Sequence, residues 1–384
     1  MDPLRIYQHW NPGKLIFGPK SLNELAIEIP CSEIPLIVTD KGISNAGILK
    51  KVGDVLEKAS IPYHLYDGIE PDPSIEIIEK AAAIYRQKGC MSVIGLGGGS
   101  SIDTAKAVSL MVTQQGTLRE FGAGKAIEAS VAPIYAIPTT AGTGSEVTNV
   151  AVITDKENKV KLVMRGTQLI PKVAVLDPEL LFSIPSKVAA ETGVDALTHA
   201  IESYVSIKSN LITEAFALSA IRIIARNLRR MVANPRDIEA AGQMLLASCM
   251  AGLSFANTGL GLTHSLAHPL GIYFHVSHGF SCGLYLPVVM DFNLIACPEK
   301  FALIADAMGE DARGLHSEQA AKKGVGAVRK LLSEVGIPRT FSELGIPFQL
   351  NPKMVEDALA AVPTTLNPRQ ADKDQISNLF KAPL

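Results

Sequence analysis

Short apolar segments alternate with helix-like segments along the first half of the chain. Stretches with helical spacing of apolar residues, near 45–59 and 74–88, separate the β-rich segments IPLIVTD, PYHLYDG and MSVIGLG. This alternation is typical of a parallel sheet covered by helices. The β pattern continues in APIYAIPTT and VAVLDPEL, and AVITDKENKVKLVM predicts a hairpin with a polar turn. We therefore expect an α/β domain with a parallel sheet over residues 1–184.

The sequence pattern changes after Pro185, where long helical segments replace the strands. Apolar residues recur at helical spacing in SKVAAETGVDALTHAIESYVS, TEAFALSAIRIIARNLRRMVA and IEAAGQMLLASCMAGLSFAN. We therefore expect an all-α domain over residues 185–384. No flexible linker separates the two domains, and clefts between domains are common ligand sites. We expect the active site in such an interdomain cleft.

Composition and charge exclude several classes of protein. The 384 residues are 47% hydrophobic and 19% charged, which is typical of a globular chain with a substantial core. A formal net charge of −2 without basic clusters offers no surface for nucleic acid. The N-terminal segment lacks the apolar stretch of a secretory signal, and no segment reaches the roughly 18 uninterrupted apolar residues of a membrane helix. We expect a cytoplasmic protein without nucleic acid or a membrane as partner.

The five cysteines are scattered along the chain, and no two of them form a C-x-x-C pair. An odd number at such spacing is typical of reduced, mostly buried thiols rather than of disulfides or a thiolate metal site. We therefore expect nitrogen and oxygen atoms to hold any metal.

A glycine-rich loop, GLGGGSSIDTAK, follows a predicted strand and leads into a helix whose start is marked by Ser100, Ser101 and Asp103. Glycines let a ligand approach the backbone closely, and N–H groups at the start of a helix favour an anion such as pyrophosphate. The loop does not match the G-x-G-x-x-G fingerprint, and a tight turn without a ligand would explain three glycines alone equally well. Together with the features below, the loop predicts a phosphate site, and the candidate cofactor-binding residues in it are Gly97, Gly98, Gly99, Ser100 and Asp103.

Two further segments support nucleotide binding. The polar loop PTTAGTGSEVT follows a predicted strand and has no long hydrophobic side chain, so we expect Thr139, Thr140 and Thr143 to contact a ligand. Asp40 ends another predicted strand, where a carboxylate can bind ribose hydroxyls and repel a 2′-phosphate. On its own, Asp40 is better explained as the cap of a helix or turn before Lys41. In combination, these segments favour NAD over NADP.

Residue types that bind metals occur in pairs at helical spacing in the second half of the chain. Asp195 and His199 are four residues apart in one predicted helix, and His264 and His268 repeat this spacing in another. Residues at this spacing lie on the same helix face. Each pair can therefore offer two ligands to one metal.

Two more histidines, His275 and His278, follow a helix break that we expect between Pro269 and Gly271. One histidine on an apolar helix is usually a core residue, but every buried imidazole or carboxylate needs a partner of its own. A metal site explains so many of them better than a core does. Imidazole and carboxylate donors suit Fe(II), Zn(II), Mn(II) or Co(II), and the residues alone do not choose among these ions.

The sequence resembles the iron-containing, or group III, alcohol dehydrogenases, within the superfamily that also holds glycerol dehydrogenase and dehydroquinate synthase. The resemblance covers nearly the whole chain and rests on FGPKSL, VTDKG, GGGSSIDTAK, PTTAGTGSEVT, DALTH and GLGLTHSLAHPLG, followed by HG. It implies a Rossmann-like N-terminal domain, a helical C-terminal domain and a divalent metal, Fe(II) first with Zn(II) as the alternative. It also implies an NAD-linked dehydrogenase of a small primary alcohol or diol and its aldehyde, and a homodimer or larger homo-oligomer.

The same resemblance implies roles for individual residues. It assigns the metal to Asp195, His199, His264 and His278, and it places His268 close to the metal and the nicotinamide without making it a ligand. Our hypothesis is that His268 is the catalytic residue that passes a proton to or from solvent. Phe255 would lie near the nicotinamide or the substrate. Cofactor contacts are implied for Asp40, Gly97, Gly98, Ser100, Thr139, Thr140 and Lys161.

The sequence departs from the family pattern at two positions. Ser277 stands where many members have proline, and His275 is an additional imidazole for which we expect a structural role first. Other activities on the same scaffold would be a hydroxyacid-oxoacid transhydrogenase, a polyol dehydrogenase or a dehydroquinate synthase-like lyase. An NAD-binding scaffold without activity is the alternative from another class, since a fold does not guarantee catalysis. The complete set of metal ligands argues against such a scaffold.

Overall fold

The computed structural model describes residues 7–10, 13–158 and 160–383. Lys159 of the predicted hairpin lies outside the described residues. So do residues 1–6, 11 and 12 of the N-terminal segment, for which we expect no secretory signal. The chain divides into two compact units. One is Trp10–Ile184, and the other is Pro185–Leu384 with the N-terminal residues up to His9.

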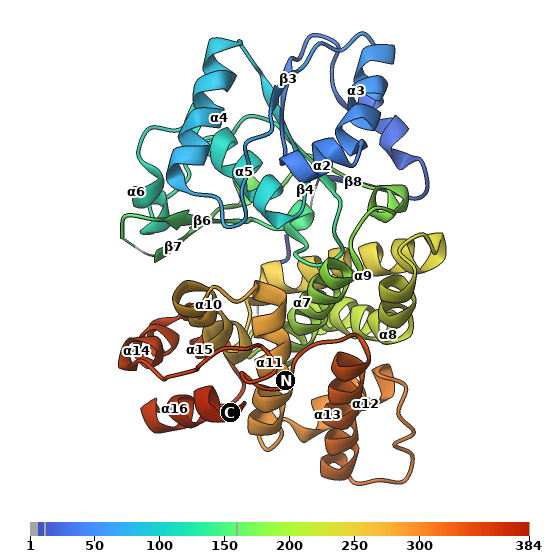
Figure 1. Cartoon of the computed structure of the whole chain (residues 1–384), viewed down its shortest axis with the longest axis vertical. Coiled ribbons are helices and arrows are strands. Elements are labelled where there is room, and N and C mark those ends of the chain that lie inside the picture. Colours follow the sequence, from blue (N-terminus) through green and yellow to red (C-terminus); the bar gives the residue numbers. More distant parts are fainter. Residues whose placement is uncertain (1–6, 11–12, 159, 384) are drawn as a thin grey trace. The chain divides into compact units, whose positions relative to one another are not determined.

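A six-stranded sheet forms the centre of the first unit (Figure 1). The strand order is β1-β8-β5-β4-β2-β3, and every neighbouring pair is parallel, which confirms the predicted fold class. Strands β2, β4, β5 and β8 consist of buried residues, as expected for a parallel sheet with both faces covered. The strands are β1 (Lys14–Phe17), β2 (Pro35–Val38), β3 (His64–Tyr66), β4 (Ser92–Gly97), β5 (Ile134–Pro138) and β8 (Val173–Leu176).

Helices connect these strands, and an antiparallel hairpin is added before the last one. The hairpin consists of β6 (Val150–Asp155) and β7 (Val160–Arg165), where the sequence predicts it. Short 3-10 helices are η1 (Ser21–Glu24), η2 (Ser145–Val147), η3 (Thr167–Leu169) and η4 (Pro178–Leu181). The α-helices are α1 (Leu25–Glu28), α2 (Lys41–Asn45), α3 (Ile48–Lys58), α4 (Ile75–Gln87), α5 (Gly99–Thr113) and α6 (Leu118–Gly122).

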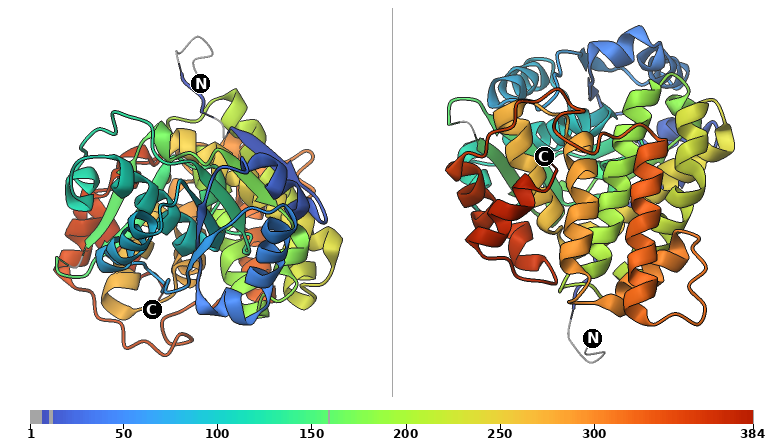
Figure 2. Two further views of the ribbon diagram at one scale, coloured as in Figure 1. Left: turned by 90° about the horizontal axis from the view of Figure 1, so that it is seen from above. Right: turned by 60° about the horizontal axis from the view of Figure 1, so that its bottom comes forward.

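The second unit contains only helices and loops among its described residues, and its long helices run side by side (Figure 2). Helix α9 is long and apolar enough to cross a membrane by length and composition, but 67% of its most apolar window is buried inside the structure. Burial of this kind is typical of a core helix. The helices are α7 (Ser186–Val205), α8 (Leu211–Ala233), α9 (Ile238–Thr258), α10 (Leu262–Phe274), α11 (His278–Asn293), α12 (Pro298–Ala307), α13 (Ser317–Glu334), α14 (Pro352–Ala360), α15 (Val362–Leu366) and α16 (Lys373–Lys381).

The helix break that we expected between Pro269 and Gly271 is wrong. Helix α10 continues through both residues to Phe274. Proline removes one helical hydrogen bond, but Leu262, Leu266 and Leu270 bury one face of the helix in a core cluster with α11, α14 and α16. This packing holds the helix together beyond the proline.

Helix α10 ends instead at His275, whose backbone has a left-handed φ of 55°. A residue in this conformation commonly ends a helix and reverses the direction of the chain. Helix α11 then begins at His278.

Candidate metal centre and nucleotide loops

Three imidazoles converge on one oxygen of Asp195 in the helical unit. Asp195 Oδ1 lies 3.5 Å from His199 Nε2, 3.7 Å from His264 Nε2 and 3.4 Å from His278 Nε2. Two atoms that bind one metal at about 2.1 Å in a tetrahedral site are about 3.4 Å apart. The distances from Asp195 to the three imidazoles therefore match those between two donors on one metal ion.

The carboxylate of Asp195 fits a cation for a second reason. Its side chain is 5% exposed, and Oδ1 accepts no hydrogen bond from the described residues. A buried carboxylate oxygen without a hydrogen bond is costly, and neighbouring imidazoles stabilise its charge only when they are protonated. A metal ion among the three imidazoles would satisfy this oxygen.

The electrostatics of the cluster also favour a positive charge at its centre. Burial raises the pKa of the Asp195 carboxyl, but the imidazoles of His199 and His278 hold it well below its usual range. Burial lowers the pKa of His278, but the Cys282 thiol and the Asp195 carboxylate raise it to about 10. Metals bind such ligands by displacing their protons, so a divalent cation suits this set of donors.

Three helices position the cluster. Helix α7 carries Asp195 and His199 one turn apart, and both are buried. His264 lies in the first turn of α10, and His278 is the first residue of α11. Ligands on packed helices keep their positions better than ligands on loops.

Glu202 is a buried member of the site that the sequence analysis missed. Its Oε2 accepts hydrogen bonds from His264 Nδ1 at 2.6 Å and from the Gly261 N–H at 2.9 Å. Its Oε1 accepts one from the Thr263 N–H at 2.5 Å. A carboxylate on Nδ1 leaves Nε2 of the imidazole free to bind a metal. The signal in the sequence was the spacing of Glu202 from Asp195, seven residues along the same helix.

Cys282 is a second residue that the sequence analysis missed. Its Sγ lies 3.6 Å from His278 Nε2 and 3.9 Å from His264 Nε2, and its side chain is fully buried. Burial raises the pKa of this thiol, but His278 and His264 hold it below its ordinary value. A sulfur atom therefore lies beside the nitrogen and oxygen donors that we expect to hold a metal. The scattered cysteines gave no sign of this thiol, because the residues around it come from three separate helices.

Two rings border the ligands. The His268 ring stacks on His278 with centroids 5.5 Å apart and meets His264 edge to face at 5.9 Å. Phe255 lies against His199, with centroids 4.4 Å apart. His275 is exposed and ends α10, so its position agrees with a structural role.

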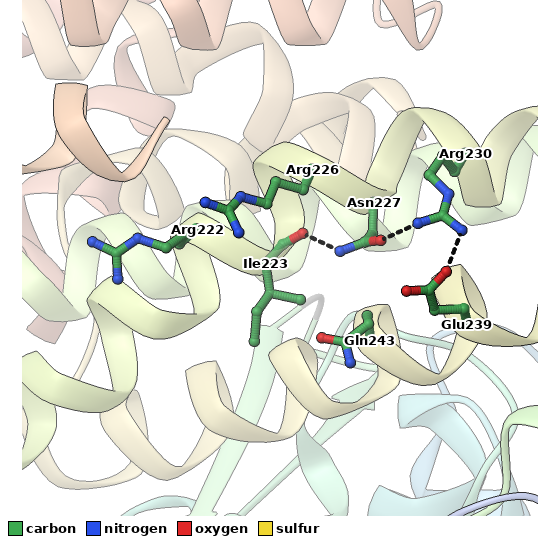
Figure 3. A pocket seen from close by; sticks show the side chains of 7 residues that line it. All are labelled: Arg222, Ile223, Arg226, Asn227, Arg230, Glu239 and Gln243. Carbon is green, nitrogen blue, oxygen red and sulfur yellow. Dashed lines mark hydrogen bonds and ion pairs between the residues drawn. The ribbon is translucent and has the colours of Figure 1, made fainter. Parts of the chain in front are cut away.

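A surface pocket of about 360 Å³ lies on α8 and α9 of the same unit (Figure 3). Arg230 forms ion pairs with Asp237 at 2.9 Å and with Glu239 at 2.7 Å, which neutralise part of the positive charge of this surface. None of the predicted site residues lines the pocket. Its lining residues are Arg222, Ile223, Arg226, Asn227, Arg230, Glu239 and Gln243.

The glycine turn of the α/β unit, residues 97–99, has no room for side chains. Gly97 has a φ of 145°, which favours glycine, and a Cβ there would lie 2.5 Å from Ser101 Oγ. A Cβ at Gly98 would lie 3.3 Å from Thr140 Oγ1, and one at Gly99 would lie 2.8 Å from Thr143 Cγ2. The turn and the polar loop after β5 therefore lie against each other.

Helix α5 begins at Gly99, one residue before the predicted start, and Gly98 provides no side-chain cap. Ser100 lies half-buried in its first turn. N–H groups at an uncapped helix start favour an anion. The turn therefore fits a phosphate group of a nucleotide.

Asp40 borders the glycine turn and caps α2. Its Oδ1 accepts a hydrogen bond from the Ile43 N–H at 3.0 Å, which is the role that its position in the sequence favours by itself. Its Oδ2 would lie 3.6 Å from a Cβ at Gly97. The capping bond thus occupies one oxygen, and the other lies near the turn. Thr139 donates its N–H to the Gly97 carbonyl at 3.0 Å.

Two predicted cofactor residues are engaged with the protein. Asp103 accepts hydrogen bonds from the Ser145 hydroxyl and, at 2.9 Å, from the Val152 N–H. Lys161 bonds to Asp72 and, at 2.9 Å, to Thr154 Oγ1. These contacts hold the hairpin and the polar loop in place, and a contact of either residue with a cofactor remains a prediction.

The buried amine of Lys106 joins α5 to the polar loop, and the sequence analysis gave it no role. Its Nζ donates hydrogen bonds to the Thr148 carbonyl at 2.9 Å and to the Val150 carbonyl at 2.8 Å. Burial lowers the pKa of Lys106 to about 8, against the opposing effect of Asp103 and Glu146. The lysine fixes the end of the loop relative to the helix.

Comparisons with known proteins match both units. The family model "Iron-containing alcohol dehydrogenase" matches residues 12–178, and "Fe-containing alcohol dehydrogenase family, C-terminal" matches residues 189–384. The chain is 37% identical over 381 residues to 1,3-propanediol dehydrogenase of Klebsiella pneumoniae, covering 98% of each protein. It is 38% identical over 346 residues to NAD-dependent methanol dehydrogenase of Bacillus methanolicus, covering 90% of this chain and 91% of that protein.

A solved structure of 1,3-propanediol oxidoreductase has the same fold. It matches with a TM-score of 0.95 at 36% identity, covering 99% of this chain and 100% of the other. The resemblance inferred from the motifs is thus confirmed over both units, and the helical unit holds a candidate metal site. The chain belongs to the iron-containing alcohol dehydrogenase family and is an NAD-dependent oxidoreductase of alcohols and aldehydes.

Proposed function

We propose that the protein interconverts small primary alcohols or diols and their aldehydes with a divalent metal bound by Asp195, His199, His264 and His278. The observation that carries this proposal is the convergence of three imidazoles on the unpartnered Oδ1 of Asp195. The relatives that act on propanediol and methanol support the substrate class. We propose Fe(II) as the ion and Zn(II) as the alternative, since both suit this set of donors.

Each part of the proposed site has a separate task. A divalent metal, when bound, would supply a positive charge that polarises the substrate oxygen. Glu202 holds His264 through Nδ1, and Phe255 supports the His199 ring. His268 is half-buried beside His278, and we assign it the transfer of the alcohol proton to or from solvent.

The α/β unit holds the nucleotide in this proposal. The N–H groups at the start of α5 bind the pyrophosphate, and the loop with Thr139, Thr140 and Thr143 closes around it. The carboxylate of Asp40 favours NAD, because it would repel the 2′-phosphate of NADP. The further proposed contacts are Gly97, Gly98, Gly99, Ser100, Asp103 and Lys161.

We also propose that the enzyme works in the cytoplasm as a homodimer or larger homo-oligomer. The composition, with its near-neutral charge and reduced cysteines, supports the first part of this proposal. The family resemblance supports the second.

Metal replacement tests the function directly. The protein is purified without oxygen, stripped of metal and reloaded separately with Fe(II) or Zn(II). Reduced nicotinamide is then followed with short alcohols, diols and their aldehydes. We expect activity to be lost on stripping, to return with Fe(II), and to be greater with NAD than with NADP. Tight metal binding without turnover of any alcohol or aldehyde would reject the function.

His268→Ala tests the proton transfer. General acid–base groups contribute roughly 10²- to 10⁴-fold to rate, so we expect kcat to fall by about 100-fold while the metal content stays unchanged. The control is His316→Ala, which removes an exposed imidazole at the start of α13 and should leave kcat as it is. Loss of metal from His268→Ala would instead identify His268 as a ligand.

A further inference from the structure

The position of Cys282 is not explained by core packing. Cys282 lies one turn after His278 on α11, and none of its side chain is exposed. A core cysteine is usually surrounded by apolar atoms. The Cys282 Sγ instead lies 3.6 Å from His278 Nε2 and 3.9 Å from His264 Nε2, the two atoms that would face a metal.

The shorter of these distances is the one expected for a shared metal, and the distance to His264 is slightly longer. A metal binds thiolate sulfur at about 2.3 Å and imidazole nitrogen at about 2.1 Å, so sulfur and nitrogen on one tetrahedral ion lie about 3.6 Å apart. Donor atoms of Asp195, His264, His278 and Cys282 all lie within 4.8 Å of one another. Oδ1 of Asp195, which accepts no hydrogen bond from the described residues, belongs to the same group and independently indicates a cation site.

We propose that Cys282 is a ligand of the divalent metal, in addition to the four nitrogen and oxygen donors. On binding, the S–H bond breaks, the proton passes to solvent, and the sulfur forms a bond to the ion without any change in oxidation state. Sulfur donors favour ions such as Zn(II) and Co(II) over Mn(II). The inference rests on the proposed function, because it concerns the same metal.

Cobalt replacement tests this proposal by spectroscopy. Co(II) is added to the metal-free, full-length protein under argon, and bound cobalt is measured after dialysis. A sulfur ligand gives a thiolate-to-cobalt charge-transfer band in the near ultraviolet. We expect this band in the wild type, in proportion to bound cobalt, and its loss in Cys282→Ala. The matched control is Cys31→Ala, which removes an exposed thiol and should keep the band.

A second measurement does not depend on the folding of a variant. X-ray absorption of the zinc-loaded wild type should show one sulfur neighbour at about 2.3 Å. Bound cobalt without a charge-transfer band, or zinc with only nitrogen and oxygen neighbours, would overturn the sulfur ligand and leave the proposed function intact. Failure of the wild type to bind cobalt or zinc at all would overturn both.

Discussion

Asp195→Asn is expected to lose its metal and, with it, nearly all dehydrogenase activity. The amide keeps the size of the side chain but removes the charge around which His199, His264 and His278 are gathered. Metal stabilisation of a developing charge is worth several kcal/mol, and each 1.36 kcal/mol changes a rate tenfold. We therefore expect kcat/KM to fall by about 1000-fold or more, and metal per chain, measured by elemental analysis, to fall with it.

The control for this variant is Glu239→Gln, the same acid-to-amide change at an exposed ion pair with Arg230. It should retain the metal and the activity of the wild type. Circular dichroism of both variants shows whether the helical unit remains folded. Normal metal content and activity in folded Asp195→Asn would contradict the proposed ligand set.

The sequence predicted the fold well because its periodicities are local. Buried parallel strands such as β2 and β5 are continuous apolar segments, and α7 to α9 have helical spacing over more than four turns. The error at α10 arose because proline is a local signal, whereas the leucines that keep the helix intact pack against distant segments. Strand β1 was not identified, since four partly exposed residues at the edge of a sheet carry little pattern.

The metal cluster was predictable in part because some of its residues share one helix, where their spacing in the sequence is a local signal. Asp195 and His199 share one helix, so their spacing alone places them together. Glu202 shares that helix too, but its hydrogen-bond partners lie 59 to 62 positions further along the chain. The spacing within one helix therefore does not show that Glu202 contacts His264. Cys282 could not be assigned, because no spacing between cysteines marks a thiol that is surrounded by histidines.

Glu202→Gln is expected to weaken metal binding by about 10- to 100-fold, the usual cost of losing the outer partner of a metal ligand. Glu202 accepts three hydrogen bonds, from His264 Nδ1 and from the N–H groups of Gly261 and Thr263. The amide of glutamine has one acceptor oxygen, and its NH₂ group would face one of these donors. His264 then loses the contact that keeps Nε2 directed at the metal. Equilibrium dialysis with Zn(II) measures the change, and Glu239→Gln again serves as the control.

The metal-free protein provides a second readout for Glu202, through the pH dependence of its unfolding. Burial raises the pKa of Glu202, but the charge of His264 and the hydrogen bonds hold it below its ordinary value of 4.5. A folded pKa below the unfolded one gives stability that is present above the unfolded pKa and lost as pH falls through the folded pKa. Wild type should therefore have a higher Tm than Glu202→Gln near pH 7, by about 2 to 4 °C for a loss of roughly 2 to 3 kcal/mol. The difference should shrink below about pH 4.5. A difference that stays the same down to pH 4 would mean that folding does not lower the pKa of Glu202, and the charge interaction with His264 would then not be the source of its stabilising effect.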